Sequence, residues 1–451
     1  MAGEPRAGAG PRIAIWGNMN NMGFSLLRYF RDLGADAYLF PYSNDGRDLS
    51  AHFAPEADSW EFDRWKTYIE ELPFPDAQIS ALDPPLSWAL SAKSRLRGLV
   101  HGTRPQLASV GRQKLRELVK DFDHIVGSGI APAVLQRIDR ALDVFAPYAS
   151  QIEYMSSFDF DSGQPTSSFL AAKVNHLVKT RQMEGVRSAR KIVSFEQVLN
   201  GPVLQQVGRQ AERLAIPMVY VETAIPNAVP SPHLISIYDR IKASDYAVLH
   251  HARLLWSKPD HISDAQWRLE SKNSHWVFQA FADVIRARPG SKPLLIAVEY
   301  GPDVANTKRL CENLGITNYM HWVKVMPRRE AMWLLTKVDA GIGEFYESQG
   351  MIWGGTGWEV MAMARPLIQG FNFEDGTFEA TFGCSPPPFL KVKRPADVTR
   401  HLLTLMDDRA QGTLIGRSCR SWFDAHNGQG LAQRWLDLIC GESDQSVHQI
   451  M

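Results

Sequence analysis

Short apolar runs alternate with helical stretches along this chain, and the alternation limits its fold more than any other feature. The pattern begins with the apolar run Arg12–Trp16, a turn at 17–21, a helical stretch at 24–33 and a second apolar run at 37–40. A strand, a helix and a second strand in this order are typical of a βαβ unit with parallel strands. The sequence therefore predicts the α/β class.

The same alternation continues through two halves of the chain. We expect further strands at 124–126, 144–145, 192–193, 218–221, 246–249, 294–298, 320–323, 340–342 and 367–368. We expect helices of the second half at 272–287, 304–314, 328–337 and 358–364, and a helical stretch at 421–438. The proline-bearing segment 226–232 is the expected linker. The predicted parts are a disordered leader at 1–11, domains at 12–230 and 231–425, and a C-terminal helix and tail at 426–451.

Composition excludes several classes of protein. Lys plus Arg and Asp plus Glu number 49 each, so no overall field indicates a nucleic-acid partner. Four cysteines without CxxC spacing predict reduced thiols rather than a disulfide framework or a zinc site. The chain has no apolar run of about 18 residues and no apolar segment near its N-terminus, which favours a cytoplasmic protein. The pair Asp159 and Asp161 is only a weak metal signal, and we expect no metal.

A glycine-rich turn in the segment 343–369 carries the strongest chemical signal. Gly354, Gly355 and Gly357 precede the expected helix at 358–364. Backbone amides at a helix N-terminus bind phosphate well, because unpaired N–H groups and the helix dipole converge there. Glu359, one step further along, has the chemistry to accept hydrogen bonds from ribose hydroxyls. The turn predicts a nucleotide site, although such a turn alone is more often structural.

Charged residues follow several neighbouring strands of the second half. Arg253 stands just beyond the run 246–249, and Lys272 stands at the start of the expected helix at 272–287. A tight turn containing Gly301 follows 294–298, and Lys324 follows 320–323. Because the carboxyl ends of parallel strands meet at one edge of a sheet, we expect these residues to lie on the same rim as the glycine-rich turn.

This order of residues resembles the nucleotide-sugar domain of GT-B glycosyltransferases, in particular the retaining glycosyltransferase family 4. The resemblance runs from Arg253 and Lys272 through Gly301 to Asp339-Ala340-Gly341-Ile342 and the stretch 362–368. It implies two Rossmann-like doubly wound domains that face each other across a cleft. It also implies that the C-terminal helix returns to the N-terminal domain.

The same resemblance implies an enzyme of polysaccharide biosynthesis. Such an enzyme moves a sugar from a nucleoside-diphosphate donor to a glycan, lipid-linked or protein acceptor, retains the anomeric configuration, and needs neither cofactor nor metal. The implied catalytic residues are Arg253 and Lys272 on the diphosphate, with Glu344 and Glu347 as candidates for the first glutamate of the family's pair. The implied donor-binding residues are Gly17, Asn18, Asn20, Gly301, Val323, Lys324, Val325, Gly354, Gly355, Thr356, Gly357 and Glu359.

The chain departs from the family pattern at three places. Met351 stands where the family has a glutamate eight residues before Glu359, so Glu344 or Glu347 would replace it. Lys258 competes with Lys272 for the role of diphosphate ligand. No histidine follows the strand at 124–126, where many family members have one. A nucleotide-binding scaffold without catalysis and a sugar-nucleotide epimerase therefore stay open as alternatives.

The acceptor side is indicated only by charge. Residues 93–120 contain eight Lys or Arg and one acid, Glu117. A solvated helix face is one interpretation of this segment. The other is a peripheral contact with anionic lipid headgroups or a lipid-diphosphate acceptor, at about 1 kcal/mol for each nearby cation. That interpretation predicts a protein at the inner face of a membrane.

Overall fold

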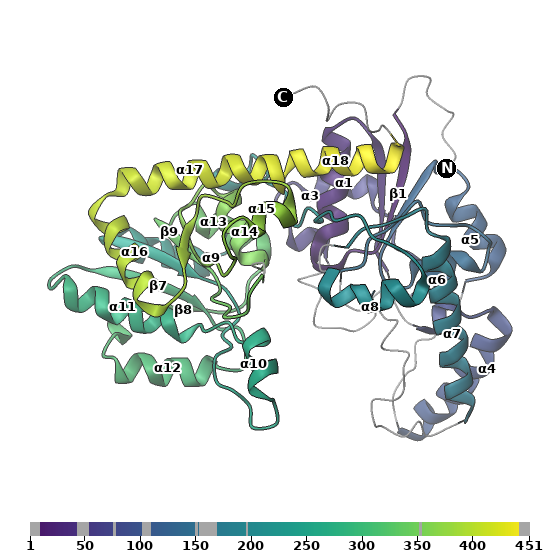
Figure 1. The fold of residues 1–451 in the computed structure, drawn as a ribbon, viewed down its shortest axis with the longest axis horizontal. Helices are drawn as coiled ribbons and strands as arrows, with labels where there is room; N and C mark the ends of the chain where they lie inside the picture. Colours follow the sequence, from purple (N-terminus) through teal and green to yellow (C-terminus); the bar gives the residue numbers. More distant parts are fainter. Residues whose placement is uncertain are drawn as a thin grey trace. The chain divides into compact units, whose positions relative to one another are not determined.

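The computed structural model describes residues 10–42, 54–74, 78–101, 110–148, 152, 169–194, 197–350 and 354–441. The chain divides into two compact units (Figure 1). The first consists of Met1–Pro55, Phe62–Tyr220 and Gly430–Met451. The second consists of Glu56–Glu61 and Val221–Gln429, so the division falls at Tyr220 and each unit includes a piece from elsewhere in the chain.

The first unit is built on a parallel sheet of five strands in the order β2-β1-β3-β4-β5. Its strands are β1 (Arg12–Trp16), β2 (Asp36–Phe40), β3 (His124–Gly127), β4 (Val144–Phe145) and β5 (Lys191–Ile192). Its longer helices are α1 (Met22–Asp32), α4 (Pro84–His101), α5 (Arg112–Val119), α6 (Ala131–Gln136), α7 (Phe169–Ser188), α8 (Gln197–Val207) and α18 (Gln429–Cys440). A short helix, α3 (Phe62–Trp65), lies between β2 and α4 in the sequence.

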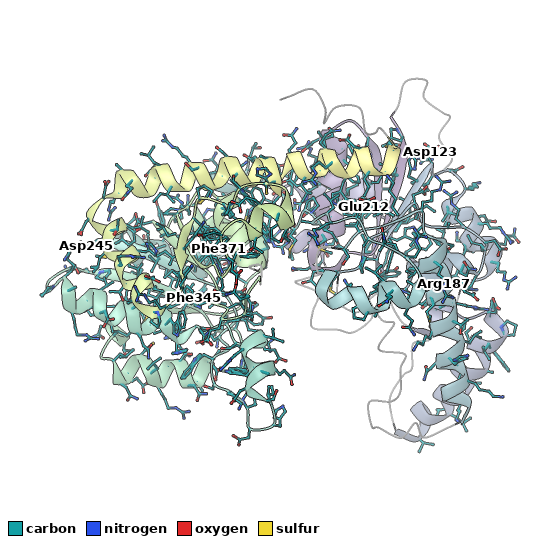
Figure 2. All side chains as sticks on the ribbon, viewed as in Figure 1. Asp123, Arg187, Glu212, Asp245, Phe345 and Phe371 are labelled. Atoms are coloured by element: carbon teal, nitrogen blue, oxygen red, sulfur yellow. The ribbon has the colours of Figure 1, made fainter. Side chains whose placement is uncertain are left out.

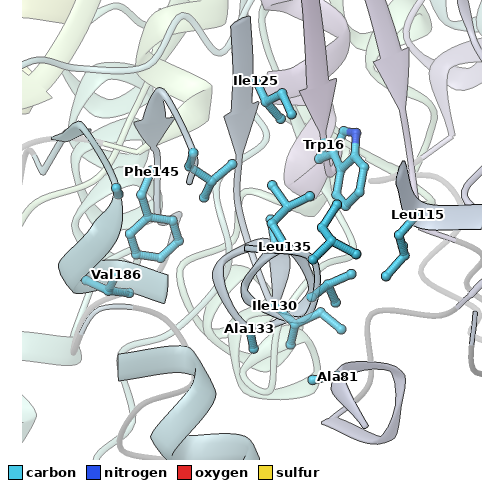
Figure 3. Close-up of a cluster of buried hydrophobic side chains, with 14 of the residues drawn as sticks. Trp16, Ala81, Leu115, Ile125, Ile130, Ala133, Leu135, Phe145 and Val186 are labelled. Atoms are coloured by element: carbon cyan, nitrogen blue, oxygen red, sulfur yellow. The ribbon is translucent and has the colours of Figure 1, made fainter. Parts of the chain in front are cut away.

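Apolar side chains cover both faces of this first sheet. On one face Trp16, Ile125 and Phe145 contact residues of α6, and Figure 3 shows this cluster. The other face packs on α1 and on α18, whose Trp435 is fully buried in the same cluster as Ile13. Strands that are buried on both faces need nearly continuous apolar sequence, which is why β1 reads Arg-Ile-Ala-Ile-Trp.

The second unit contains a parallel sheet of six strands in the order β11-β10-β9-β6-β7-β8. Its strands are β6 (Tyr246–His250), β7 (Pro293–Val298), β8 (Met320–Val323), β9 (Ala340–Ile342), β10 (Leu367–Gly370) and β11 (Leu390–Val392). Its helices are α9 (Pro232–Lys242), α10 (Asp264–Glu270), α11 (His275–Ala287), α12 (Val304–Asn313), α13 (Arg328–Leu335), α14 (Gly355–Ala362), α15 (Thr377–Phe382), α16 (Pro395–Asp407) and α17 (Arg409–His426). Every residue of β7 is buried, and α11 packs Val277, Phe278 and Phe281 into the core that β7 shares.

The two parallel sheets confirm the predicted α/β class. The strand predicted at 218–221 is wrong: this stretch is not assigned to a strand. Side chains rather than a neighbouring strand satisfy its carbonyls, since Ser25 Oγ donates to Met218 O at 3.1 Å and Tyr29 Oη to Val219 O at 2.9 Å. Strand β11 had no counterpart in the prediction, because Lys391 interrupts its apolar residues.

Two expected helices begin or end elsewhere. Lys272 does not open a helix, since α11 begins at His275 after Ser274 at its N-cap position. The helical stretch expected at 421–438 is broken, because α17 ends at His426 and α18 begins at Gln429. The break coincides with the passage of the chain from the second unit to the first.

Candidate functional site

The second sheet reverses its strand order between β6 and β9, and the candidate site lies at the carboxyl ends of these two strands. The chain runs from β6 outward to β7 and β8, then returns to the other side of β6 with β9. His250 at the end of β6 pairs with Ile342 at the end of β9. In open α/β sheets, ligands bind outside the carboxyl ends of strands at such a reversal.

Lys272 and Glu344 form a buried ion pair at this reversal. Lys272 lies in the segment before α11, where its backbone N–H donates to Leu255 O at 2.9 Å and its carbonyl accepts from Phe345 N at 3.1 Å. Its Nζ contacts Oε1 of Glu344, a side chain that is 3% exposed. Burial, the largest single effect, raises the pKa of the Glu344 carboxyl, but Lys272 together with the hydrogen bonds from Tyr346 and Gly354 more than reverses this and holds it below its usual value.

The second oxygen of Glu344 contacts the glycine-rich turn. Oε2 accepts hydrogen bonds from Tyr346 Oη at 3.0 Å and from the backbone N–H of Gly354 at 3.1 Å. A Cβ on Gly354 would lie 2.9 Å from Oε2, so only glycine lets the carboxylate approach this closely. The anion near the N-terminus of α14 in this structure is therefore a side chain of the protein.

A buried glutamine holds the backbone of Glu344 in place. Gln369 of β10 is fully buried; its Oε1 accepts from Glu344 N at 3.2 Å, and its Nε2 donates to Glu344 O. A Cβ on Gly343 would lie 1.8 Å from that Oε1. Phe345, the residue after Glu344 (Figure 2), is fully buried and stacks on Trp276 of α11. The position of Glu344 is thus determined by β10 and α11 together.

Glu359 lies in a second charged cluster with His251, Arg328 and Asp58, which were not among the predicted site residues. Its Oε2 is 2.8 Å from His251 Nε2, and its Oε1 accepts from Arg328 Nε at 2.8 Å. Arg328 also binds Asp58 at 2.9 Å, and all four residues belong to the second unit. Burial raises the pKa of the Glu359 carboxyl, but His251 and Arg328 more than reverse this and lower it.

This cluster had one usable signal in the sequence. His251 directly follows β6 and Arg328 follows the loop after β8, so both stand at the same edge as Arg253. Asp58 had no signal, because it lies 270 residues from Arg328 along the chain. Both oxygens of Glu359 are engaged by cationic or polar side chains, and contact with a ribose stays a prediction.

Arg253 is the exposed cation of the site. Its guanidinium makes no hydrogen bond or ion pair with another residue in the described part of the chain. Gly301 lies against it: with φ +116° its added Cβ would be 2.4 Å from Leu254 O and 3.0 Å from Arg253 Cγ. Leu254 N donates to Tyr300 O at 2.7 Å and joins the two loops. Glycine at 301 is therefore needed to bring the loop after β7 against Arg253.

The other predicted residues of the second unit make contacts outside the two charged clusters. Glu347 is exposed, and its Oε1 is 3.4 Å from Asn273 Nδ2. Lys324 binds Glu299, and Val325 is 51% exposed, whereas Val323 is buried in β8. Lys258 binds Asp264 at an exposed position, so Lys272 is the lysine paired at the strand reversal.

Within the glycine-rich turn, the described residues begin at Gly354. Met351 and the two residues after it lie outside the described part of the chain. Gly355, Thr356 and Gly357 form the first turn of α14. The Thr356 hydroxyl is buried and has no hydrogen-bond partner among the described residues. A buried hydroxyl without a partner at the N-terminus of a helix is consistent with a site that a polar ligand completes.

Gly17, Asn18 and Asn20 lie in the first unit, after β1. Asn18 is 4% exposed; its Oδ1 accepts from Phe24 N at 2.9 Å and its Nδ2 donates to Asn21 Oδ1 at 2.8 Å. Gly17 has φ +97°, and a Cβ there would lie 2.2 Å from Ser128 Oγ. These contacts account for the local turn, and donor binding by the three residues stays a prediction.

The described residues show neither a metal cluster nor a membrane-spanning helix. They contain no group of three or more His, Cys, Asp or Glu side chains arranged to hold a metal ion. Asp159 and Asp161 lie outside the described residues. None of the described helices has the length and apolarity needed to cross a membrane.

Comparisons with solved structures identify the architecture. OtsA, a trehalose-6-phosphate synthase, superposes with a TM-score of 0.54 at 12% identity, covering 96% of this chain and 100% of that one. HepE of Anabaena, solved with UDP and glucose, gives 0.53 at 12% identity over 94% and 98%. A glycosyltransferase of Rickettsia africae gives 0.52 at 12% identity over 96% and 100%. The chain has the GT-B fold.

The resemblance that predicted the GT-B fold covers about residues 245–425, and the structural match extends over nearly the whole chain. No family model matches the sequence, and no curated protein matches it either. At this level of identity the likeness concerns the fold. The chemistry of the site has to be argued from its own residues.

Proposed function

We propose that this chain is a retaining glycosyltransferase that moves a sugar from a nucleoside-diphosphate donor to a glycan, lipid-linked or protein acceptor. The observation that carries the proposal is the exposed Arg253 beside the Lys272–Glu344 pair, at the strand reversal of a GT-B sheet. Cations at this position suit a diphosphate, and the N-terminus of α14 supplies amides on the same edge.

The chemistry of the transfer explains the need for these residues. Breaking a bond between a sugar and a diphosphate builds negative charge on the leaving phosphate. Arg253, Lys272 and the amides of Gly355 and Thr356 would stabilise that charge, and groups already held in place do so most effectively. Glu344 holds Lys272 in position, and Glu359 would accept from the ribose or hold His251 at the edge of the site. No metal is assigned a role.

A catalytically impaired nucleotide-binding scaffold is the second candidate. The observation that favours it lies after β3, where Ser128 and Gly129 stand in the position that many family members give to a histidine. Lys272 and Arg328 are also both already paired with carboxylates. Transfer of sugar, or hydrolysis of the donor without acceptor, separates the enzyme from the scaffold.

Arg253 provides the sharpest test of the donor site because it is exposed. We expect one nucleotide family among UDP, GDP, ADP, CMP and their sugars to raise the melting temperature; saturation at 100 times Kd adds about 2.7 kcal/mol. Arg253→Ala should weaken that affinity tenfold or more, since a charge-assisted hydrogen bond contributes about 1.5–3 kcal/mol.

Arg417→Ala is the matched control, an exposed arginine on α17 of the same unit. It should bind like the wild type. Equal affinities in the two variants would remove Arg253 from the donor site. No shift with any nucleotide would count against both candidate functions.

A further inference from the structure

We propose that α4 of the first unit docks on an anionic lipid bilayer, with Trp88, Leu96 and Leu99 entering the headgroup region. The inference deepens the acceptor side of the proposed function, because it assigns the acceptor to a membrane surface. It rests on the outer face of one helix of the first unit, whereas Arg253, Lys272 and Glu344 lie in the second unit.

The outer face of α4 is apolar and exposed. Trp88 is 70% exposed, Leu96 70%, Leu99 84% and Val100 74%. At about 100° per residue, these four side chains fall within a sector of about 120°. Single exposed apolar residues are ordinary, but four on one face of a helix form a patch that calls for a partner.

The opposite face of α4 attaches the helix to its unit. Ser87 and Ser91 are buried, and Leu86 and Leu90 pack against the first hydrophobic core. Figure 1 shows α4 at the margin of the first unit, away from the strands. The helix therefore has apolar residues on its outer face as well as on its inner face, unlike an ordinary surface helix.

The charged residues in the sequence of α4 suit an anionic surface. The sequence of α4 contains Lys93, Arg95 and Arg97 and no acidic residue, and Lys93 is exposed. An apolar face beside a cluster of cations is the pattern of a helix that lies in a membrane interface, and tryptophan is enriched at that depth.

The same charges argue against a second copy of the chain as the occupant. A two-fold interface puts one surface patch against its own copy, so the cation-rich α4 segment would meet a second segment of the same charge. Anionic headgroups relieve that repulsion, and each cation near them contributes about fivefold in affinity. A bilayer thus satisfies both the apolar and the charged part of the surface.

Flotation with lipid vesicles tests the proposal. The wild-type chain should bind vesicles that contain phosphatidylglycerol, bind pure phosphatidylcholine far more weakly, and be released by salt. The double variant Leu96→Ser with Leu99→Ser should bind about tenfold more weakly or worse, because two inserted side chains are lost. Leu414→Ser is the matched control, since Leu414 of α17 is 62% exposed in the second unit and should leave binding unchanged.

Brominated lipids supply a second readout. They should quench part of the tryptophan fluorescence of the wild type, and Trp88→Phe should abolish most of that quenching. Equal binding by the wild type and the double variant would overturn the proposal. So would a dimer, measured by light scattering, that the double variant converts to monomer.

The outcome is separable from the proposed function. The double variant should keep the thermal shift with nucleotide, because its substitutions are exposed and lie in the first unit. Loss of vesicle binding with an intact nucleotide shift supports the membrane contact. Failure of the wild type to bind vesicles, with an intact shift, overturns the membrane contact alone.

Discussion

His250 illustrates how one residue at the end of a strand can make stability depend on pH. The side chain is buried beside Phe278, and its Nδ1 lies 3.1 Å from Ile342 O. Burial lowers its pKa from 6.5 to about 4, and the Ile342 carbonyl offsets only part of this. In the folded chain the imidazole is therefore neutral at pH values where the unfolded chain already binds a proton.

We expect the free energy of unfolding to fall as pH drops from 6.5 to about 4, by about 3 kcal/mol from this residue. The unfolded chain takes up the proton first, so acid favours unfolding throughout that window, and the contribution levels off below it. His250→Gln should show a flatter pH dependence in urea unfolding over the same range. The same slope in wild type and variant would show that other groups cause it.

The ion pairs of the site illustrate a different effect at the same scale. Glu344 and Glu359 both have lowered pKa values, so both stay ionised in the neutral range although they are buried. Their contribution to stability is present above the ordinary carboxyl pKa of 4.5 and is lost as pH falls through the lower folded values. At the pH of ordinary assays, the site is therefore a set of fixed charges.

At the scale of elements, the junction of β9, α14 and β10 depends on close approach. Gly343→Ala would place a Cβ 1.8 Å from Gln369 Oε1 and push the glutamine away from both backbone groups of Glu344. We expect a loss of about 3 kcal/mol in the free energy of unfolding, measured with urea, from overpacking and unpaired buried groups.

The control for this substitution is Gly111→Ala at the start of α5. Nothing lies within 4 Å of a Cβ there, and its φ of −63° suits any residue. The change should be under about 1 kcal/mol. A similar small change at Gly343 would mean that Gln369 has room to move and does not hold Glu344.

At the scale of the whole molecule, the first unit depends on the end of the chain. Trp435 of α18 is fully buried, and its Nε1 donates to Ala215 O at 2.7 Å. Trp435→Ala should destabilise the first unit by about 3–5 kcal/mol, because it leaves a large cavity against β1 and α1. Hydrogen exchange should rise in β1 and α1 and stay unchanged in β6 and β9.

Trp422→Ala is the control for that effect. Trp422 lies on α17 of the second unit, stacks on Trp358, and donates to Ser385 O at 2.8 Å. Its loss should leave the exchange of β1 as it is. Faster exchange of β1 in both variants would contradict an effect confined to the first unit.

Much of the fold was predictable because strands that are buried on both faces appear in the sequence as short apolar runs. β1, β4, β8 and β9 occupy the predicted residues, and other strands differ by one or two at their ends. The prediction failed at 218–221, where an apolar run lies extended but is held by Ser25 and Tyr29, side chains about 190 residues away. Periodicity does not distinguish these two ways of satisfying a carbonyl.

The neighbourhood of the candidate site was also predictable, but its pairing was not. Arg253, Lys272 and Glu344 do gather at one strand edge, since parallel strands bring their carboxyl ends together. The bonds of Glu359 to His251 and Arg328 were missed, because they depend on how the ends of β6, β8 and α14 approach in space.

The sequence by itself determined the α/β class, the buried strands and the residues that gather at the carboxyl edge of the second sheet. These features follow from apolar periodicity and strand order, which are local properties of the chain. Only the tertiary structure decided which charges pair, that Glu56–Glu61 belongs to the second unit, and that α18 completes the core of the first. These depend on contacts between residues far apart in the chain, such as Asp58 and Arg328 at 270 positions, and no local sequence pattern records their energies.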